Sequence, residues 1–205
     1  MFNLNAFLSY VIVVTFTPGP NNIMSMVNSS KFGFKKTFKF MLGVASGFFI
    51  IMLLSSFFNL FLFKAMPQIQ IFMKILGTAY LLYLASKIMG FDPIHWIMGK
   101  EKKASGNGAA VMRSFRTGML LQFINPKAIL YGITIVANFI IPFYDKPYQL
   151  ILFALFLSLT ALASVCSWGL FGSFFNKFLS KYEKPFNVVM ALLLVYSALT
   201  ILGIA

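Results

Sequence analysis

Apolar residues fill six long runs along this chain, and short polar stretches separate them. Most runs approach or exceed the ~20 residues that a helix needs to cross the hydrocarbon core of a bilayer. They lack the alternation of apolar and polar residues that is typical of membrane-barrel strands, so the pattern predicts helices. The runs cover residues 4–28, 40–63, 69–89, 117–141, 148–175 and 186–204.

The composition supports a membrane protein. Hydrophobic residues make up 60% of the 205 residues and charged residues only 10%, where about 25% charged is usual for a soluble domain. A soluble domain of this length cannot bury so much apolar surface. Disorder is excluded by the same numbers, and a disulfide scaffold is excluded because Cys166 is the one cysteine. We therefore predict an all-α, polytopic membrane protein with a single transmembrane domain.

The net charge of +13 would suggest nucleic acid in a soluble protein. Here the basic residues cluster between the apolar runs, so they indicate orientation, and we expect no nucleic-acid partner. The loops after the second and fourth runs carry only Lys64 and Lys146. The loops after the first, third and fifth runs carry Lys31, Lys35, Lys36, Lys39, Lys87, Lys100, Lys102, Lys103, Arg113, Arg116, Lys177, Lys181 and Lys184. The positive-inside rule then predicts both termini outside the cytoplasm.

The two halves of the chain resemble each other. The segment 76–83 of the third run is similar to 189–196 of the sixth, and the first helix of each half is interrupted at proline. Three helices per half predict inverted repeats: repeat one over about 1–90, a cytoplasmic loop over about 91–116, and repeat two over about 117–205. Inverted repeats with broken helices in corresponding positions, here helices one and four, are typical of secondary transporters.

The first break lies within the first run. Its residues are Thr17, Pro18, Gly19, Pro20, Asn21 and Asn22. The prolines remove N–H donors and release carbonyls, and Pro20 suits the first position of a new half-helix. Free N–H groups at that start would bind a carboxylate, and the released carbonyls would suit an ammonium group. A zwitterionic amino acid matches both; a simple kink that aids packing is the alternative.

The second break is Asn125-Pro126-Lys127. Lys127 lies roughly ten residues, or ~15 Å, into its run. A cation at that depth indicates function, with extension toward the interface as the alternative. Both breaks lie at a similar distance from the cytoplasmic side, so we expect them to form one substrate site. Gln122, Tyr80 and Tyr131 are further candidates, although hydrogen bonding between helices explains them equally well.

No catalytic or metal-binding arrangement is visible. All four acidic residues fall in loops or at helix ends, which argues against a divalent-cation carrier. One loop histidine, His95, has no paired ligands. We therefore expect that the protein is not an enzyme, has no catalytic residues and binds no metal or cofactor.

Three motifs carry a resemblance to the LysE/RhtB family of bacterial amino-acid exporters. They are the segments 17–22, 122–128 and 76–81. The resemblance implies a multi-pass protein of the bacterial cytoplasmic (inner) membrane that exports a small amino acid, driven by the proton-motive force. The segments 18–23, 129–132 and 190–196 are most similar to the members that export cysteine and O-acetylserine. Many relatives carry Asp where this chain has Asn21, and Asn21 favours a neutral substrate.

The resulting expectation is an exporter of small neutral amino acids or their derivatives, with Lys127 as the candidate proton carrier. Its partners are then the amino-acid substrate and membrane lipid, and a homodimer stays open. The alternatives are export of another amino acid, such as threonine, homoserine or leucine, or a scaffold subunit that transports nothing.

Overall fold

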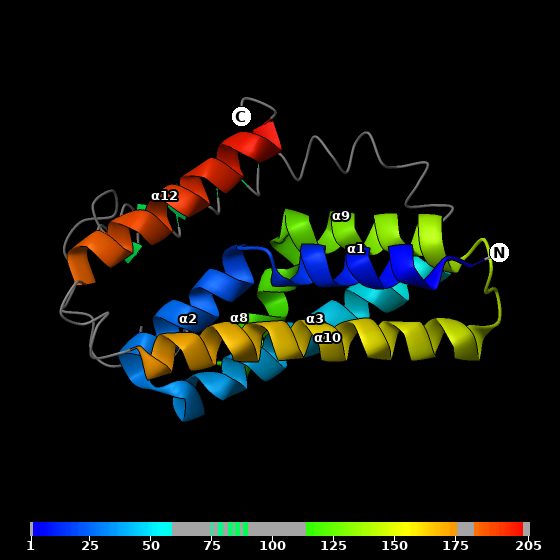
Figure 1. The fold of residues 1–205 in the computed structure, drawn as a ribbon, viewed down its shortest axis with the longest axis horizontal. Helices are drawn as coiled ribbons and strands as arrows, with labels where there is room; N and C mark the ends of the chain where they lie inside the picture. Colours follow the sequence, from blue (N-terminus) through cyan, green and yellow to red (C-terminus); the bar gives the residue numbers. More distant parts are fainter. Residues whose placement is uncertain are drawn as a thin grey trace.

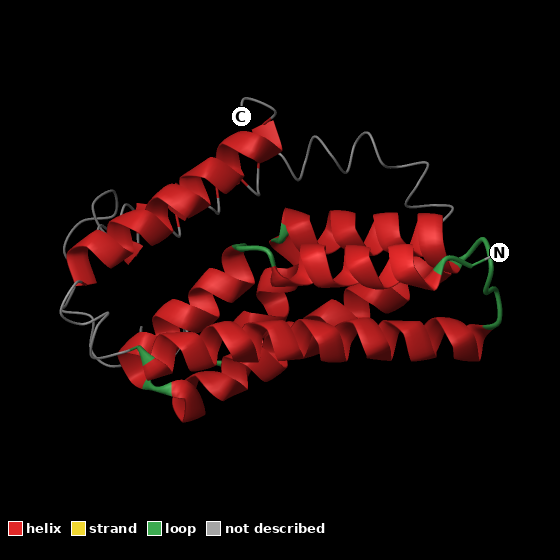
Figure 2. Cartoon of the chain, viewed as in Figure 1, coloured by secondary structure: helices red, strands yellow, loops and turns green. Residues whose placement is uncertain are grey.

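A computed structural model describes residues 2–58, 114–175 and 183–202, and between them residues 75, 78–79, 82–83, 85–86 and 88–89. Regular structure in these residues is helical throughout, with no strand among them, as Figure 2 shows. The all-α prediction is therefore confirmed. Of the segment 76–81, only residues 78 and 79 are described, so Tyr80 lies outside the described residues. The loop over 91–113 lies outside them as well.

The described helices follow five of the six predicted runs (Figure 1), and most of the third run, 69–89, lies outside the described residues. They are α1 (Leu4–Phe16), α2 (Pro20–Phe32), α3 (Phe34–Phe57), α8 (Phe115–Leu120), the 3₁₀ turn η1 (Leu121–Ile124), α9 (Pro126–Ile135), the π-helical turn η2 (Val136–Ile140), α10 (Pro147–Phe174) and α12 (Glu183–Leu202). The six-helix layout and its inverted repeats stay predictions.

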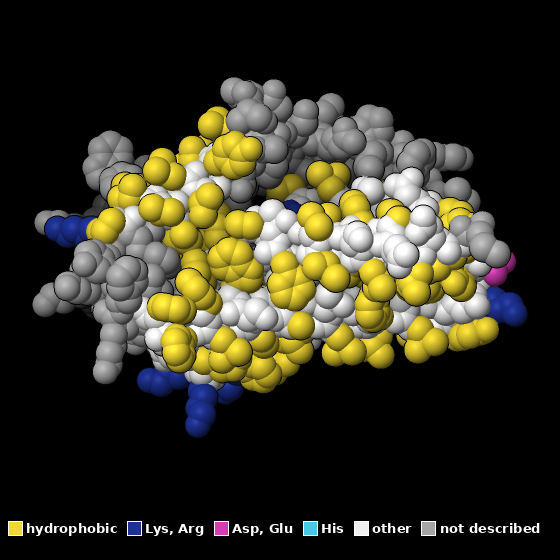
Figure 3. Space-filling model, viewed as in Figure 1, with side chains coloured by type: hydrophobic (Ala, Val, Ile, Leu, Met, Phe, Trp, Pro, Cys, Tyr) yellow, Lys and Arg dark blue, Asp and Glu magenta, His cyan; other side chains and the backbone are white. Residues whose placement is uncertain are grey.

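Within the described part, two helices are long and apolar enough to cross a membrane. These are α3 and α10, whose most apolar stretches have mean hydropathies of 2.1 and 2.3. The pair α8–η1 and α9–η2, bent by 65°, adds a third span if the two pieces are counted together. Apolar side chains are spread over the whole described face seen in Figure 3, and lysine and arginine gather mainly at its ends. This arrangement fits a membrane-embedded protein.

The basic segment after α2 differs from the prediction. We expected a loop carrying Lys31, Lys35, Lys36 and Lys39, with the second helix starting at residue 40. Instead α2 extends through Lys31, and α3 already begins at Phe34, so the other three lysines are helical. Gly33 alone makes the turn, at a φ of 83° that favours glycine. The exposed lysines of this segment are compatible with a helix because their side chains still reach water.

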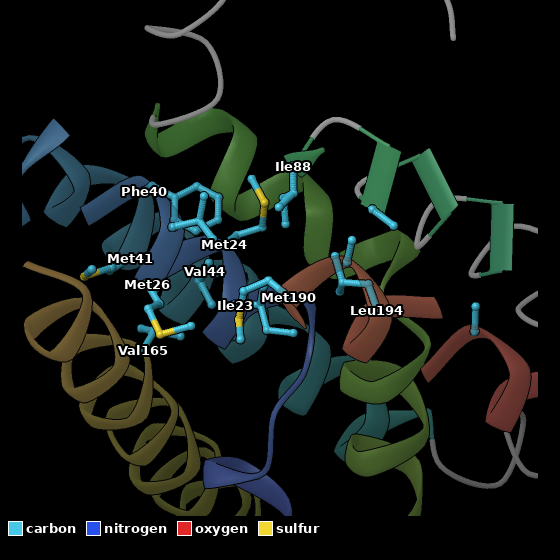
Figure 4. Close-up of a cluster of buried hydrophobic side chains, with 14 residues drawn as sticks. Ile23, Met24, Met26, Phe40, Met41, Val44, Ile88, Val165, Met190 and Leu194 are labelled. Carbon is cyan, nitrogen blue, oxygen red and sulfur yellow. The ribbon is translucent and has the colours of Figure 1, made fainter. Parts of the chain in front are cut away.

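Two hydrophobic clusters hold the helices together. One is rich in methionine and joins α2, α3 and α12 through Met24, Met26, Met41 and Met190, with Val165 from α10 (Figure 4). The other is rich in aromatic residues and joins α1, α3, α9 and α10. The long helix α10 packs against both α2 and α3. The two helix breaks lie where the clusters meet, because residues of both clusters line the cavity described below.

Helices α3 and α8 approach each other closely at glycine. A Cβ added to Gly43 would collide with the carbonyl oxygen of Phe115, and one added to Gly118 would collide with the carbonyl oxygen of Phe40. Gly47 meets α8 in the same way, at Met119. Gly43 and Gly47, four residues apart on α3, therefore serve tight packing between the two helices. This contact fixes the helix that precedes the second break.

Candidate functional site

The first break separates α1 from α2. Helix α1 ends at Phe16, and α2 starts with Pro20 at its first helical position and Gly19 before it. Proline at this position loses no hydrogen bond, because the first N–H groups of a helix have no partner inside it. The next N–H groups of α2, those of Asn21 and Asn22, lack such a partner for the same reason. The new half-helix predicted from Pro20 is thus present.

Side chains bind three of the carbonyls that the break releases, those of Thr15, Phe16 and Thr17. Both protons of the Asn22 amide are used: its Nδ2 lies 3.0 Å from the Thr15 oxygen and 3.0 Å from the Thr17 oxygen. The Ser164 hydroxyl of α10 lies 2.9 Å from the Thr15 oxygen and 3.3 Å from Oδ1 of Asn22. Asn22 therefore holds the break together from within.

Two further side chains complete this set. Nε1 of Trp168 donates to the Phe16 oxygen at 3.3 Å, and Nζ of Lys127 donates to the Thr17 oxygen at 2.8 Å. Ser164 and Trp168 are not among the site residues predicted from the sequence. The available signal was that an indole N–H or a hydroxyl in an apolar helix needs an acceptor.

The second break has the same construction. Asn125 precedes α9, Pro126 takes the first helical position, and Oδ1 of Asn125 accepts the N–H of Lys127 at 3.1 Å. Asn125 is only 2% exposed. Among the described residues its Nδ2 meets no acceptor, and Asn125 lines the cavity. The N–H groups of the buried Asn125 amide are thus available to a ligand.

Lys127 joins the two breaks. It belongs to the first turn of α9, and its ammonium crosses to the end of α1, beside which α9 starts in Figure 1. The side chain passes close to Gly19, where an added Cβ would lie 3.1 Å from Cδ and 3.2 Å from Nζ. A larger residue at position 19 would crowd this path.

An amide pair forms a second connection between the breaks. Nδ2 of Asn21 donates to Oε1 of Gln122 at 2.8 Å, and Nε2 of Gln122 donates to Oδ1 of Asn21 at 3.1 Å. Gln122 also donates to the carbonyl of Gly118 at 3.0 Å and is completely buried. The two amides satisfy each other, so these side chains are occupied in this structure.

A cavity of about 50 Å³ lies where the breaks meet. Its polar wall comes from the two helix starts and Lys127, and its apolar wall from α1, α3, α9 and α10. The lining residues are Val14, Thr15, Gly19, Pro20, Asn21, Asn22, Val44, Phe48, Asn125, Lys127, Ala128, Tyr131, Ala161 and Val165. A volume of this size holds a few water molecules.

Tyr131 forms part of one wall. Its ring is stacked between Phe48, at 5.7 Å, and Tyr10, at 5.8 Å between ring centroids. Its hydroxyl lies 3.5 Å from Oγ1 of Thr15. The aromatic stack continues from Tyr10 to Phe139, at 5.4 Å. This column closes the cavity on the side of the aromatic cluster.

The structure thus brings most of the predicted site residues together. Gly19, Pro20, Asn21, Asn22, Asn125, Lys127 and Tyr131 line the cavity. Thr17 contributes its carbonyl to Lys127, and Gln122 reaches the cavity only through Asn21. Pro18 and Pro126 shape the two breaks. Tyr80 lies outside the described residues.

Known proteins resemble this chain over nearly its whole length. A curated relative named cysteine/O-acetylserine efflux protein, from Klebsiella pneumoniae subsp. pneumoniae, is 33% identical over 97% of this chain and 96% of its own. Proteins of the same name from Salmonella typhimurium and Escherichia coli are 31% identical over the same shares. No solved structure matches the chain.

The family comparison agrees with these relatives. The family model described as LysE type translocator matches residues 12–205. This range includes both breaks and every residue that lines the cavity. Translocators move solutes and are not enzymes, in agreement with the sequence analysis. The chain is a multi-pass membrane protein, and it belongs to the LysE type translocator family.

Proposed function

We propose that this protein exports small neutral amino acids or their derivatives, such as cysteine and O-acetylserine, across the cytoplasmic membrane of a bacterium. The relatives named as efflux proteins for these two compounds support the substrate class. In this proposal the proton-motive force drives export. Both termini face outward, as the distribution of Lys and Arg indicates.

One observation carries this proposal: two helix starts open on the same cavity beside a lysine. Helix N-termini attract anions through their free N–H groups and their dipoles. The N–H groups of Asn21, Asn22 and Ala128 and the free Nδ2 of Asn125 supply donors for a carboxylate. Lys127 supplies the positive charge.

The rest of the cavity favours a small uncharged side chain. Its other walls are Val44, Phe48, Ala161 and Val165, which present no charge to a substrate. Position 21 carries a neutral amide that is already paired with Gln122. A cationic side chain would meet Lys127 without an acid among the lining residues to balance it.

Transport in reconstituted vesicles tests this proposal. Labelled cysteine, O-acetylserine, threonine, leucine and lysine are loaded separately, and efflux is followed with and without an imposed proton gradient. We expect gradient-dependent efflux of cysteine or O-acetylserine. Efflux of threonine or leucine alone would name a different substrate, and efflux of lysine would contradict the argument from Asn21. No flux from folded, inserted protein would favour the scaffold alternative.

A matched pair of variants tests the site. Lys127→Met removes the charge at the cavity, and we expect loss of efflux with an unchanged amount of protein in the membrane. Lys146→Met removes an equal charge from an exposed position before α10 and should leave efflux unchanged. Normal efflux by Lys127→Met would exclude Lys127 as a substrate ligand and as the proton carrier.

A further inference from the structure

The ammonium of Lys127 donates a hydrogen bond to a carbonyl that the break in helix one releases. Its Nζ lies 2.8 Å from the Thr17 oxygen. Such a carbonyl is the kind of acceptor that an amino acid's α-ammonium needs, and Lys127 presents the same chemical group. With Lys127 in this place, the Thr17 oxygen already has a cationic partner.

Two other released carbonyls, those of Thr15 and Phe16, have partners of a different kind. The Thr15 oxygen is held by Asn22 and Ser164, and the Phe16 oxygen by Trp168. These partners are neutral, and they belong to α2 and α10, which pack tightly against each other. We therefore expect these hydrogen bonds to persist when a substrate enters.

Lys127 is the partner that is able to leave. It comes from α9, on the other side of the break, through a long and flexible side chain. The Thr17 oxygen keeps its bond from Asn22 at 3.0 Å after the lysine departs. The carbonyl therefore stays satisfied, and releasing Lys127 leaves no orphaned acceptor.

We propose that an amino acid loads into this site by exchange with Lys127. The substrate's α-ammonium replaces Nζ at the Thr17 oxygen, and the released Nζ pairs with the α-carboxylate of the same molecule. No covalent bond changes, and a zwitterion leaves the net charge of the cavity as it was. This inference rests on the proposed function and specifies how that site selects its substrate.

The exchange requires both charged groups on one molecule. A compound with the ammonium alone would place two cations at the break with no anion between them, and like charges repel. A compound with the carboxylate alone would draw Lys127 away without supplying an ammonium, so the charge-assisted bond at the Thr17 oxygen would be lost and only the neutral bond from Asn22 would remain. The site therefore selects free α-amino acids over their N-acetylated or amidated forms.

Competition against efflux tests this selectivity. The probes are the transported amino acid itself, its N-acetyl derivative, which lacks the ammonium, and its amide, which lacks the carboxylate. We expect each derivative to compete at least about tenfold more weakly than the parent, as sites built to bind a polar group reject analogues that lack it. Equal competition by the N-acetyl derivative would overturn the exchange, while efflux itself would still support the proposed function.

A variant gives an independent readout. In Lys127→Met the Thr17 oxygen loses its resident cation, so the amide derivative should bind better than it does to the wild-type protein. Binding is measured on purified protein as the ligand-induced shift of the thermal unfolding temperature, with Lys146→Met as the control. A larger shift with the amide supports the exchange, and an unchanged or smaller shift overturns it. If Lys127→Met does not fold, Lys127→Gln replaces it and the same criterion applies.

Discussion

The amide pair between Asn21 and Gln122 yields a quantitative prediction. Asn21→Ala removes the two hydrogen bonds of the pair, and Gln122→Ala removes these and the bond to Gly118. A side-chain hydrogen bond contributes about 1 kcal/mol in proteins generally and about 0.6 kcal/mol on average between membrane helices. We expect losses in the free energy of unfolding of about 1–2 kcal/mol for Asn21→Ala and about 2–3 kcal/mol for Gln122→Ala.

The double variant separates the pair from its surroundings. The two bonds of the pair are lost in either single variant and are counted only once in the double variant. The double variant should therefore be more stable than the sum of the single losses predicts, by about 1–2 kcal/mol. The free energy of unfolding is measured by titrating purified protein in mixed micelles with a denaturing detergent.

A third amide provides the control. Asn138 is exposed, and its Nδ2 bonds to the Thr134 carbonyl one turn earlier at 2.9 Å. Asn138→Ala should change stability by less than about 0.5 kcal/mol. If the losses of Asn21→Ala and Gln122→Ala add within about 0.5 kcal/mol, the two amides do not act as a unit, and the predicted coupling between them is absent.

Three further predictions concern packing, the first break and orientation. Gly118→Leu should destabilise the protein by about 1–3 kcal/mol in the same titration, because its side chain would collide with the backbone of α3; unchanged stability would contradict the close contact. Ser164→Ala should cost about 1 kcal/mol, since the Thr15 carbonyl loses one of its two partners; a neutral effect would mean that Asn22 alone suffices. Single cysteines at Lys36 and Lys146, in a chain without its native cysteine, should react with an impermeant maleimide from the cytoplasmic and the outer face respectively. Labelling of both from one face would refute the orientation.

The class of the protein and the location of its breaks follow from local properties of the amino-acid sequence. Apolar runs of this length cannot remain in water, so they predict membrane helices. Proline lacks an N–H and clashes with the preceding turn, so helices had to end near Pro18 and Pro126. These effects are local, which is why α2 and α9 start at the prolines that the sequence indicated. The turn at Gly33 was missed because one glycine replaces the expected loop.

The contacts of the side chains at the breaks depend on how distant helices pack together. The depth of Lys127 indicated function, but its partner, the Thr17 carbonyl, lies 110 residues away in the sequence. The same holds for Asn21 with Gln122 and for the carbonyls bound from α10. A released carbonyl accepts any donor that packing brings near, and packing depends on the whole chain. The pattern of residues therefore predicted that a polar site exists, whereas the contacts between distant helices decided which groups fill it and which remain open to a substrate.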